Sequence, residues 1–421
     1  MLKTTDVAAP APLQLADASP ALSAWALDPE LKHLNHGSFG GVPQAALDHQ
    51  SAMRREMERA PVAWFPGLPQ RIAGVRGRLA TVLDVAPERL ALVPNASAGA
   101  SVVFGGVRLS PGAEVLVTDH GYGAVTMGAA RAARRVGGSL RTARVPLAAD
   151  EDEAFEAIWA TVTDRTELLV LDHITSPTAR RLPVGRVCAE ARLRGIYTLV
   201  DGAHVPMLLE SPIAEADADF WVGNLHKYGC APRGTAVLIA RPEVADLAYP
   251  LIDSWGGELG FPDRFDHQGT LDLTSWLAAP VALEFVEDAF GWNQVRTYTS
   301  DLAGWAQDLV ATALSEASGE DCGADVGMPV GPLRLVALPK GLATVHLEAN
   351  GLRDRLLAEA GIESAFTSFG GRGYLRLSAH AYNTGEDYLD FVERAVPLLL
   401  QWVDHTTPQH ATVNPTERRE Q

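Results

Sequence analysis

The chain alternates between short apolar runs rich in β-branched residues and longer segments with the spacing of amphipathic helices. The apolar runs lie at 90–93, 114–118, 168–172, 197–200, 220–222 and 235–239. The helical segments between and beside them lie at 70–83, 98–108, 125–137, 151–162 and 184–194. Apolar strands that alternate with helices are buried on both faces, which is typical of a mostly parallel, doubly wound α/β sheet.

The pattern changes from about Trp276. Long helical stretches at 274–290 and 292–315 precede strand-like pieces at 333–338, 342–347 and 373–378 and an amphipathic helix at 386–403. This mixture predicts a smaller α+β domain. The expected division is a flexible N-terminus (1–20), a large domain (21–285) whose first segment packs with the small domain, a small domain (286–405) and a flexible tail (406–421).

Composition narrows the class of protein and its setting. The net charge of −17 over 421 residues argues against nucleic acid or an anionic membrane as a partner. No apolar run approaches the length of a membrane span, and the first residues lack the features of a signal peptide. The three cysteines form no Cys-x-x-Cys pair, so neither a metal site nor a disulfide framework is indicated. We expect a reduced, cytoplasmic setting.

Polar side chains follow five of the predicted strands at their carboxyl ends, where open α/β sheets bind ligands. These residues are Asn95 and Ser97, on either side of the backbone of Ala96; His120 and Tyr122; Asp172 and His173; Asp201 and His204; and Asn224, His226 and Lys227. Four of the chain's 12 histidines lie in this set, so a purely structural role for all of them is hard to sustain.

Lys227 follows an apolar strand and lies beside His226. A lysine that loses solvation near a cleft has a lowered pKa, and its neutral amine can attack a carbonyl to form a Schiff base. The alternative is a surface lysine on a connecting loop. Asp201 and His204, which follow the preceding strand, favour the chemical role.

The set as a whole suits a cofactor with a phosphate, an aromatic ring, a protonatable ring nitrogen and an aldehyde. The helix that begins near Asn95 and Ser97 can bind a phosphate, although either residue could instead be an ordinary N-cap. A carboxylate can keep the ring nitrogen protonated, and a lysine can bind the aldehyde. Pyridoxal phosphate (PLP) has all of these groups.

Three motifs resemble those of fold-type I PLP enzymes of aminotransferase class V. They are Asp201-Gly-Ala-His204, His226-Lys227 and Arg376-Leu-Ser-Ala-His-Ala-Tyr-Asn-Thr384. The resemblance runs from about residue 34 to 384 and is greatest to the isopenicillin N epimerase-like branch, with cysteine desulfurases more distant. It implies a large domain with a mostly parallel seven-stranded sheet, a smaller C-terminal α+β domain and a homodimer with shared active sites.

The resemblance also implies roles for individual residues. Lys227 would be the Schiff-base lysine and proton shuttle, Asp201 the partner of the pyridinium nitrogen, and His204 a neighbour of the phenolic oxygen. The phosphate would be held by Asn95, Ala96, Ser97, Asn224 and His226, with Thr270 reaching it from the neighbouring subunit.

Three further assignments follow from the resemblance, each with an alternative. His120 matches the position that stacks on the cofactor ring, and Tyr122 is the alternative. Arg376 would bind the substrate carboxylate, and is otherwise an ordinary strand-edge arginine. Asn35 and His36 lie in a loop that resembles a substrate-facing segment, and the alternative is a simple glycine turn.

Two stretches depart from the resembling families. Residues 366–373 contain no cysteine where desulfurases carry a reactive one, so we do not expect persulfide chemistry. In the stretch 175–181, Ala179 replaces a glycine that is usual among relatives. Arg180 and Arg181 add charge there and are expected to reshape the floor of the pocket.

The predicted reaction begins at Cα of an amino acid, most simply as β-elimination that cleaves the C–S bond of a bulky cysteine S-conjugate in specialised, antibiotic-type metabolism. One alternative is decarboxylation coupled to oxidative deamination of an S-cysteinyl intermediate, as among relatives in lincosamide-type pathways. Another is epimerisation, which needs a second acid or base such as Tyr122, His173 or His36. The non-enzymatic alternative is a PLP-binding regulator.

Overall fold

The computed structural model describes residues 8–406 and contains a large, mostly parallel sheet. Its seven strands lie in the order β2-β8-β7-β6-β5-β3-β4, and β8 is antiparallel to both of its neighbours. The strands are β2 (Leu90–Val93), β3 (Glu114–Thr118), β4 (Ser139–Ala143), β5 (Thr166–Asp172), β6 (Tyr197–Asp201), β7 (Phe220–Asn224) and β8 (Ala236–Ala240). The predicted fold class is therefore confirmed.

Helices connect and cover these strands, as the alternating pattern predicts. They are α5 (Ala96–Gly106), α6 (Gly123–Arg135), α7 (Glu151–Trp159), α8 (Val184–Leu193) and α9 (Pro212–Ala216). The helix α5 packs unusually close to β7, because a Cβ at Gly99 would lie 2.6 Å from Val222 Cγ1. This close approach brings the N-terminus of α5 to the end of β7, where the candidate lysine follows.

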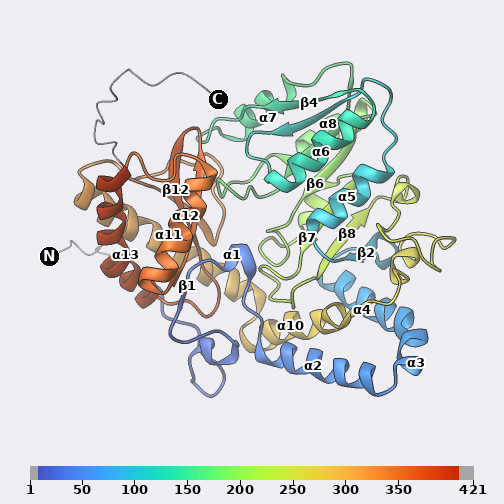
Figure 1. The fold of residues 1–421 in the computed structure, drawn as a ribbon, viewed down its shortest axis with the longest axis horizontal. Coiled ribbons are helices and arrows are strands. Elements are labelled where there is room, and N and C mark those ends of the chain that lie inside the picture. Colours follow the sequence, from blue (N-terminus) through green and yellow to red (C-terminus); the bar gives the residue numbers. More distant parts are fainter. Residues whose placement is uncertain (1–7, 407–421) are drawn as a thin grey trace, which may run out of the picture.

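A second, antiparallel sheet of order β11-β12-β9 lies beside the large one with α11, α12 and α13, and α1 lies between the two parts (Figure 1). Its strands are β9 (Leu333–Ala337), β11 (Ala365–Phe369) and β12 (Arg372–Ser378), and β1 (Lys32–His33) pairs in parallel with β10 (Ile362–Glu363). The remaining helices are α1 (His36–Phe39), α2 (Gln44–Arg59), α3 (Pro61–Trp64), α4 (Leu68–Val82), α10 (Thr274–Phe290), α11 (Trp292–Ser318), α12 (His346–Ala360) and α13 (Gly385–Thr406).

The strand predicted at 342–347 is wrong. Residues 342–345 form a loop and α12 begins at His346. Ala343 has a φ of +52°, in the left-handed region, which no extended strand accommodates. The apolar character of the run reflects burial of Leu342 and Ala343 in the core, and a short apolar run does not distinguish a strand from a buried loop.

The predicted domain division stays a prediction, and its proposed boundary at 285 falls inside α10. Residues 8–20 belong to the packed body, because Leu13 is buried and Gln14 bridges to Pro20. The expected flexible ends at 1–7 and 407–421 lie outside the described residues. Within 8–406, each helix is too short or too polar to cross a membrane.

Candidate active site

Lys227 lies in the turn that follows β7, with its amine directed at the ends of neighbouring strands. Its Nζ is 3.0 Å from Nε2 of His204. Removal of the amine from water, together with the charge of Arg376, lowers the pKa of Lys227 to about 7, although Asp201 and Asp172 oppose this shift. A substantial fraction of the amine is therefore neutral, and nucleophilic, near neutral pH.

Asp201 and His204 surround this amine as the sequence predicts. Asp201 ends β6, is 2% exposed, and accepts a hydrogen bond from the amide of Ala203 at 3.0 Å. Burial raises the pKa of Asp201, while the Ala203 amide and Lys227 lower it. Burial, Lys227 and Arg376 hold the pKa of His204 well below its usual range, so its imidazole is neutral. The cluster is suited to pairing with a cationic ring N–H.

The N-terminus of α5 lies at the same edge of the sheet. Asn95 caps the helix by accepting from the Ala98 amide at 2.8 Å, and Asn224 accepts from the Ala96 amide at 2.8 Å. Asn95 is therefore an N-cap, as the alternative reading held. The partly buried Ser97 lies on the first turn between these contacts, and the helix end presents the positive end of its dipole.

His226 and Thr270 fit the predicted phosphate site less directly. Nδ1 of His226 lies 3.0 Å from the carbonyl oxygen of Thr235, and burial lowers the pKa of His226 to about 4. In the neutral ring Nδ1–H donates to that carbonyl, which leaves Nε2 as an acceptor with no proton for a phosphate. Thr270 is exposed on the loop before α10.

The structure separates the two candidates for ring stacking. His120 is fully buried, with Nδ1 2.7 Å from Oγ1 of Thr178 and Nε2 2.7 Å from the carbonyl oxygen of Val145. One face of its ring packs against Phe369, with centroids 4.3 Å apart. Tyr122, by contrast, is 45% exposed. A side chain that stacks on a ligand needs an open face, so the geometry favours Tyr122 over His120.

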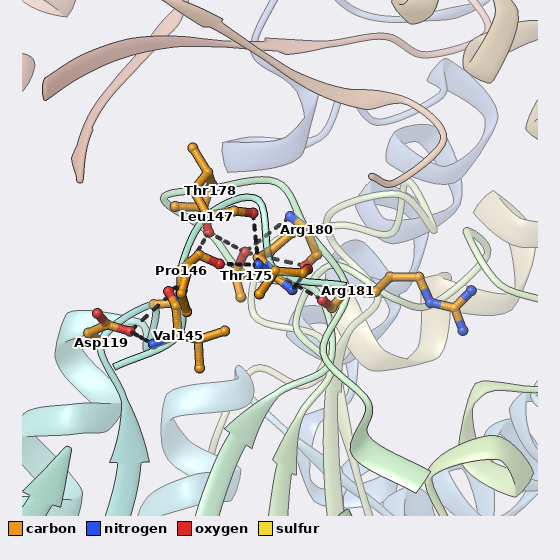
Figure 2. A network of polar contacts seen from close by, with 10 residues as sticks. Asp119, Val145, Pro146, Leu147, Thr175, Thr178, Arg180 and Arg181 are labelled. Carbon is orange, nitrogen blue, oxygen red and sulfur yellow. Dashed lines mark hydrogen bonds and ion pairs between the residues drawn. The ribbon is translucent and has the colours of Figure 1, made fainter. Parts of the chain in front are cut away.

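The stretch 175–181, which differs from relatives at Ala179, takes part in a buried polar network next to His120. Figure 2 shows the members of this network. Arg180 is fully buried and donates to carbonyl oxygens of the loop 146–149 at 2.7–2.9 Å. Its backbone amide donates to Oγ1 of Thr175 at 3.1 Å. Arg181 forms an ion pair with Glu215. Arg180 therefore joins two loops and Arg181 is ion-paired, and the expected effect of both arginines on the pocket floor stays a prediction.

Ala179 occupies a backbone conformation that favours glycine, with a φ of +49°. We expect Ala179→Gly to raise the free energy of unfolding by about 0.5–1 kcal/mol, because relief of left-handed strain exceeds the added entropy of the unfolded chain. Urea denaturation measures this change. Ala157→Gly, inside α7, is the control and should instead lower the free energy of unfolding by about 1 kcal/mol. Equal losses in both variants would contradict the prediction.

Arg376 points from β12 toward the same space and has no acidic partner among the described residues. It is 3% exposed. Its Nη1 donates to the carbonyl and hydroxyl oxygens of Ser176 at 2.8 and 3.1 Å, and its Nη2 donates to Ser38 at 2.8 Å and Asn35 at 3.4 Å. Its Nε has no partner. Since all four acceptors are neutral, the buried positive charge remains available to an anion such as a substrate carboxylate.

Asn35 and His36 have different surroundings. The amide oxygen of Asn35 supports Arg376, whereas His36 is buried with Nδ1 2.9 Å from the hydroxyl of Tyr382 and Nε2 3.0 Å from the carbonyl oxygen of Lys227. Its ring also stacks on His380. This placement does not match the predicted substrate-facing role of His36. The residue instead ties the backbone of the lysine turn to the C-terminal motif.

The three cysteines are free and buried. Burial raises the pKa of the Cys188 thiol to about 12 and also raises the pKa values of Cys230 and Cys322. Cys230, His36 and His380 lie close enough to suggest metal ligands, but both ring nitrogens of His36 already have protein partners. We interpret this group as core packing.

Sequence reasoning missed two kinds of site residue. Ser38 and Ser176 hold Arg376, but small hydroxyl residues in loops carry no distinctive signal. Asp172 was recognised at a strand end but received no role, although the structure buries it beside Asp201. The sequence could have predicted this proximity, because the two aspartates end consecutive strands of a parallel sheet.

The lysine amine with its lowered pKa lies at the same sheet edge as the buried Asp201 and the N-terminus of α5, an arrangement that suits PLP. The family model of aminotransferase class V matches residues 67–329, which is more than half of the chain. The chain belongs to the aminotransferase class V family, so the predicted family is confirmed, and the predicted enzyme class and cofactor agree with it.

Individual relatives differ in the reaction that their names describe. The chain is 32% identical to isopenicillin N epimerase of Streptomyces clavuligerus over 89% of this chain and 96% of the relative. It is 25% identical to L-cysteine desulfhydrase of Arabidopsis thaliana over 84% and 85% of the two chains. A solved structure of C-DES, a lysine-to-alanine mutant with glycine covalently linked to the PLP cofactor, matches with a TM-score of 0.78 at 20% identity, covering 90% of this chain and 99% of the other.

Proposed function

We propose that this protein is a PLP-dependent lyase that cleaves the C–S bond of a cysteine S-conjugate by β-elimination. One observation carries the choice of reaction. His36 and His173, two of the three candidates for a second acid or base, are buried with both ring nitrogens engaged. Tyr122 remains as the candidate for a second group, and elimination does not need it because Lys227 alone can move the proton.

Four residues of the site have a part in this reaction. Bound PLP would withdraw electrons from Cα of the substrate. Arg376 would bind the substrate carboxylate and fix the orientation of Cα, since its guanidinium lacks an acidic partner in the described chain. Lys227 would remove the proton from Cα and return it to the departing sulfur. Asp201 would pair with the ring nitrogen, and His204 would keep the lysine amine in place at 3.0 Å.

Two further observations support elimination over desulfuration. The stretch 366–373 forms the β11–β12 hairpin, which turns at Gly370 and Gly371 and contains no cysteine. All three cysteines elsewhere are buried with raised thiol pKa values, which makes a thiolate nucleophile unfavourable.

Epimerisation is the second candidate, because the exposed Tyr122 could supply a proton from the face opposite Lys227. We expect Tyr122→Phe to reduce pyruvate formation from an S-alkyl cysteine by less than about tenfold, since the ring and its stacking remain. If the enzyme is instead an epimerase, Tyr122→Phe should lower the rate of epimerisation at Cα by about 10²-fold or more. Mass spectrometry separates the outcomes. Pyruvate plus thiol indicates elimination, a solvent deuteron at Cα without other change indicates epimerisation, and loss of carbon dioxide indicates decarboxylation.

We also propose a homodimer with shared active sites. Besides Thr270, the segment before α10 exposes large apolar side chains, of which Trp255 is 96% exposed. The others are Tyr249, Leu251, Ile252 and Leu259. Such a concentration on a single chain is typical of a surface that another chain covers. Light scattering at micromolar concentration should give twice the mass of the chain, and a monomeric mass in active protein would contradict the proposal.

A further inference from the structure

Asp172 is a second buried carboxyl group beside the one predicted to pair with the cofactor. It ends β5 and is the direct register partner of Asp201 at the end of β6. Partners on adjacent parallel strands point to the same face, and the strands lie about 4.8 Å apart. Asp172 is 6% exposed and Asp201 is 2% exposed. Two carboxyl groups this close, with so little water, do not both ionise readily.

The surroundings favour a proton on Asp172 and a charge on Asp201. The titratable groups that act on Asp172 are Asp201 and Lys227, and the Tyr122 backbone amide contacts its carboxyl group. Burial and the charge of Asp201 raise the pKa of Asp172 well above its usual range. Asp201 accepts the shorter amide hydrogen bond, 3.0 Å from Ala203 against 3.3 Å between Asp172 and Tyr122. A short hydrogen bond from an N–H stabilises the charged form.

Asp172 also holds the backbone of the turn that carries Tyr122. The amide of Tyr122 donates to Oδ1 of Asp172. The turn is tightly packed, since a Cβ at Gly121 would lie 2.8 Å from Oγ1 of Thr126 and 3.1 Å from the carbonyl oxygen of Thr118. The backbone at Tyr122 is therefore held by one carboxyl oxygen of Asp172, and the packing at Gly121 leaves little room for a side chain there.

We propose that Asp172 is a positioning residue that remains neutral, holds Tyr122 against the cofactor ring, and leaves Asp201 as the single negative charge for the ring nitrogen. This inference rests on the proposed PLP function. It assigns the two aspartates different tasks, although they occupy equivalent positions on neighbouring strands. One negative charge then balances one cationic ring N–H, and a second charge is avoided.

The first test measures the apoenzyme and does not depend on the cofactor. A carboxyl group whose folded pKa is raised binds its proton more tightly in the folded state, so its contribution to stability falls as pH rises above about 4. Asp172→Asn removes the ionisable group, and with it this decrease in stability. The amide oxygen of the asparagine can still accept the hydrogen bond from the Tyr122 amide. The melting temperature of D172N should match that of the wild type near pH 4 and exceed it increasingly toward pH 7. A lower melting temperature for D172N at pH 7 would overturn the neutral assignment.

The second test titrates each apoenzyme with pyridoxal phosphate and follows visible absorbance. D172N should bind the cofactor with nearly the wild-type dissociation constant, and D172A about tenfold more weakly, because one positioning hydrogen bond is lost. D201N should bind pyridoxal phosphate at least about a hundredfold more weakly, since it removes the negative charge that would pair with the ring nitrogen. If D172N resembled D201N, or D172A matched D172N, the positioning role would be wrong. Absence of binding by the wild type would instead refute the proposed function, and the apoenzyme test would still decide the protonation of Asp172.

Discussion

Lys227→Ala should reduce turnover by at least about 10³-fold and remove the absorbance band of the covalent lysine–cofactor bond, because the variant lacks both the covalent anchor and the acid–base group. The effect is expected to be large since the amine is drawn out of water and its pKa is lowered to about 7. Borohydride reduction of the wild type, followed by peptide mapping, should label Lys227. Steady-state kinetics and an absorbance spectrum of each variant measure the outcome.

A matched control is available because the chain has few lysines. Lys340 is exposed on a loop of the small sheet, so Lys340→Ala should leave the spectrum and the turnover unchanged. Cofactor that stays attached to the Lys227→Ala polypeptide after borohydride reduction, or label found at Lys340 in the wild type, would contradict the assignment.

The lowered pKa also gives the lysine prediction a pH dependence. Only the neutral amine reacts with an aldehyde, so the rate at which apoenzyme takes up pyridoxal phosphate should fall about tenfold per unit as pH drops below about 7. Above that pH the rate should level off. An unperturbed lysine would continue to gain reactivity up to about pH 10. Stopped-flow absorbance across this range distinguishes the two, and a rate that rises steadily through pH 9 would show that Lys227 is not desolvated.

The sequence was most informative where local pattern and chemistry agree. Asp201 and Lys227 each follow an apolar strand, and parallel strands carry their ends to one edge, so proximity in the fold followed from the pattern. The same reasoning failed for β4, because Ser139–Ala143 is a mostly polar edge strand with little apolar signal. It also failed for β11, whose residues 365–369 are recognisable only through pairing with β12.

Contacts between distant segments were beyond local pattern. Asn35 and Ser38 hold Arg376 from more than 300 positions away in the chain, and His36 contacts the carbonyl of Lys227 from 191 positions away. Nothing in the loop 35–40 reveals which of its side chains faces a site and which is buried. The choice between His120 and Tyr122 likewise depended on burial, which two neighbouring aromatic positions do not disclose.

Arg376→Ala should lower kcat/KM by about 10²–10³-fold, equivalent to about 3–4 kcal/mol, because a buried charge-assisted interaction with the substrate carboxylate is lost. Arg376→Lys should recover only part of the lost kcat/KM, since a lysine cannot make the bidentate contact with a carboxylate. The structure supports a large effect. The guanidinium is 3% exposed, and its present acceptors are neutral oxygens of serine and asparagine residues.

A comparison of substrates isolates that carboxylate from any general disturbance of the site. The wild type should prefer an S-alkyl cysteine over its carboxamide by about 10²-fold or more, and the preference should nearly vanish in Arg376→Ala. Arg334→Ala, on the neighbouring strand β9, is the control and should keep the preference. If Arg376→Ala lost activity on both substrates equally and retained the preference, the arginine would act on the fold of β12, and another cation would have to bind the carboxylate.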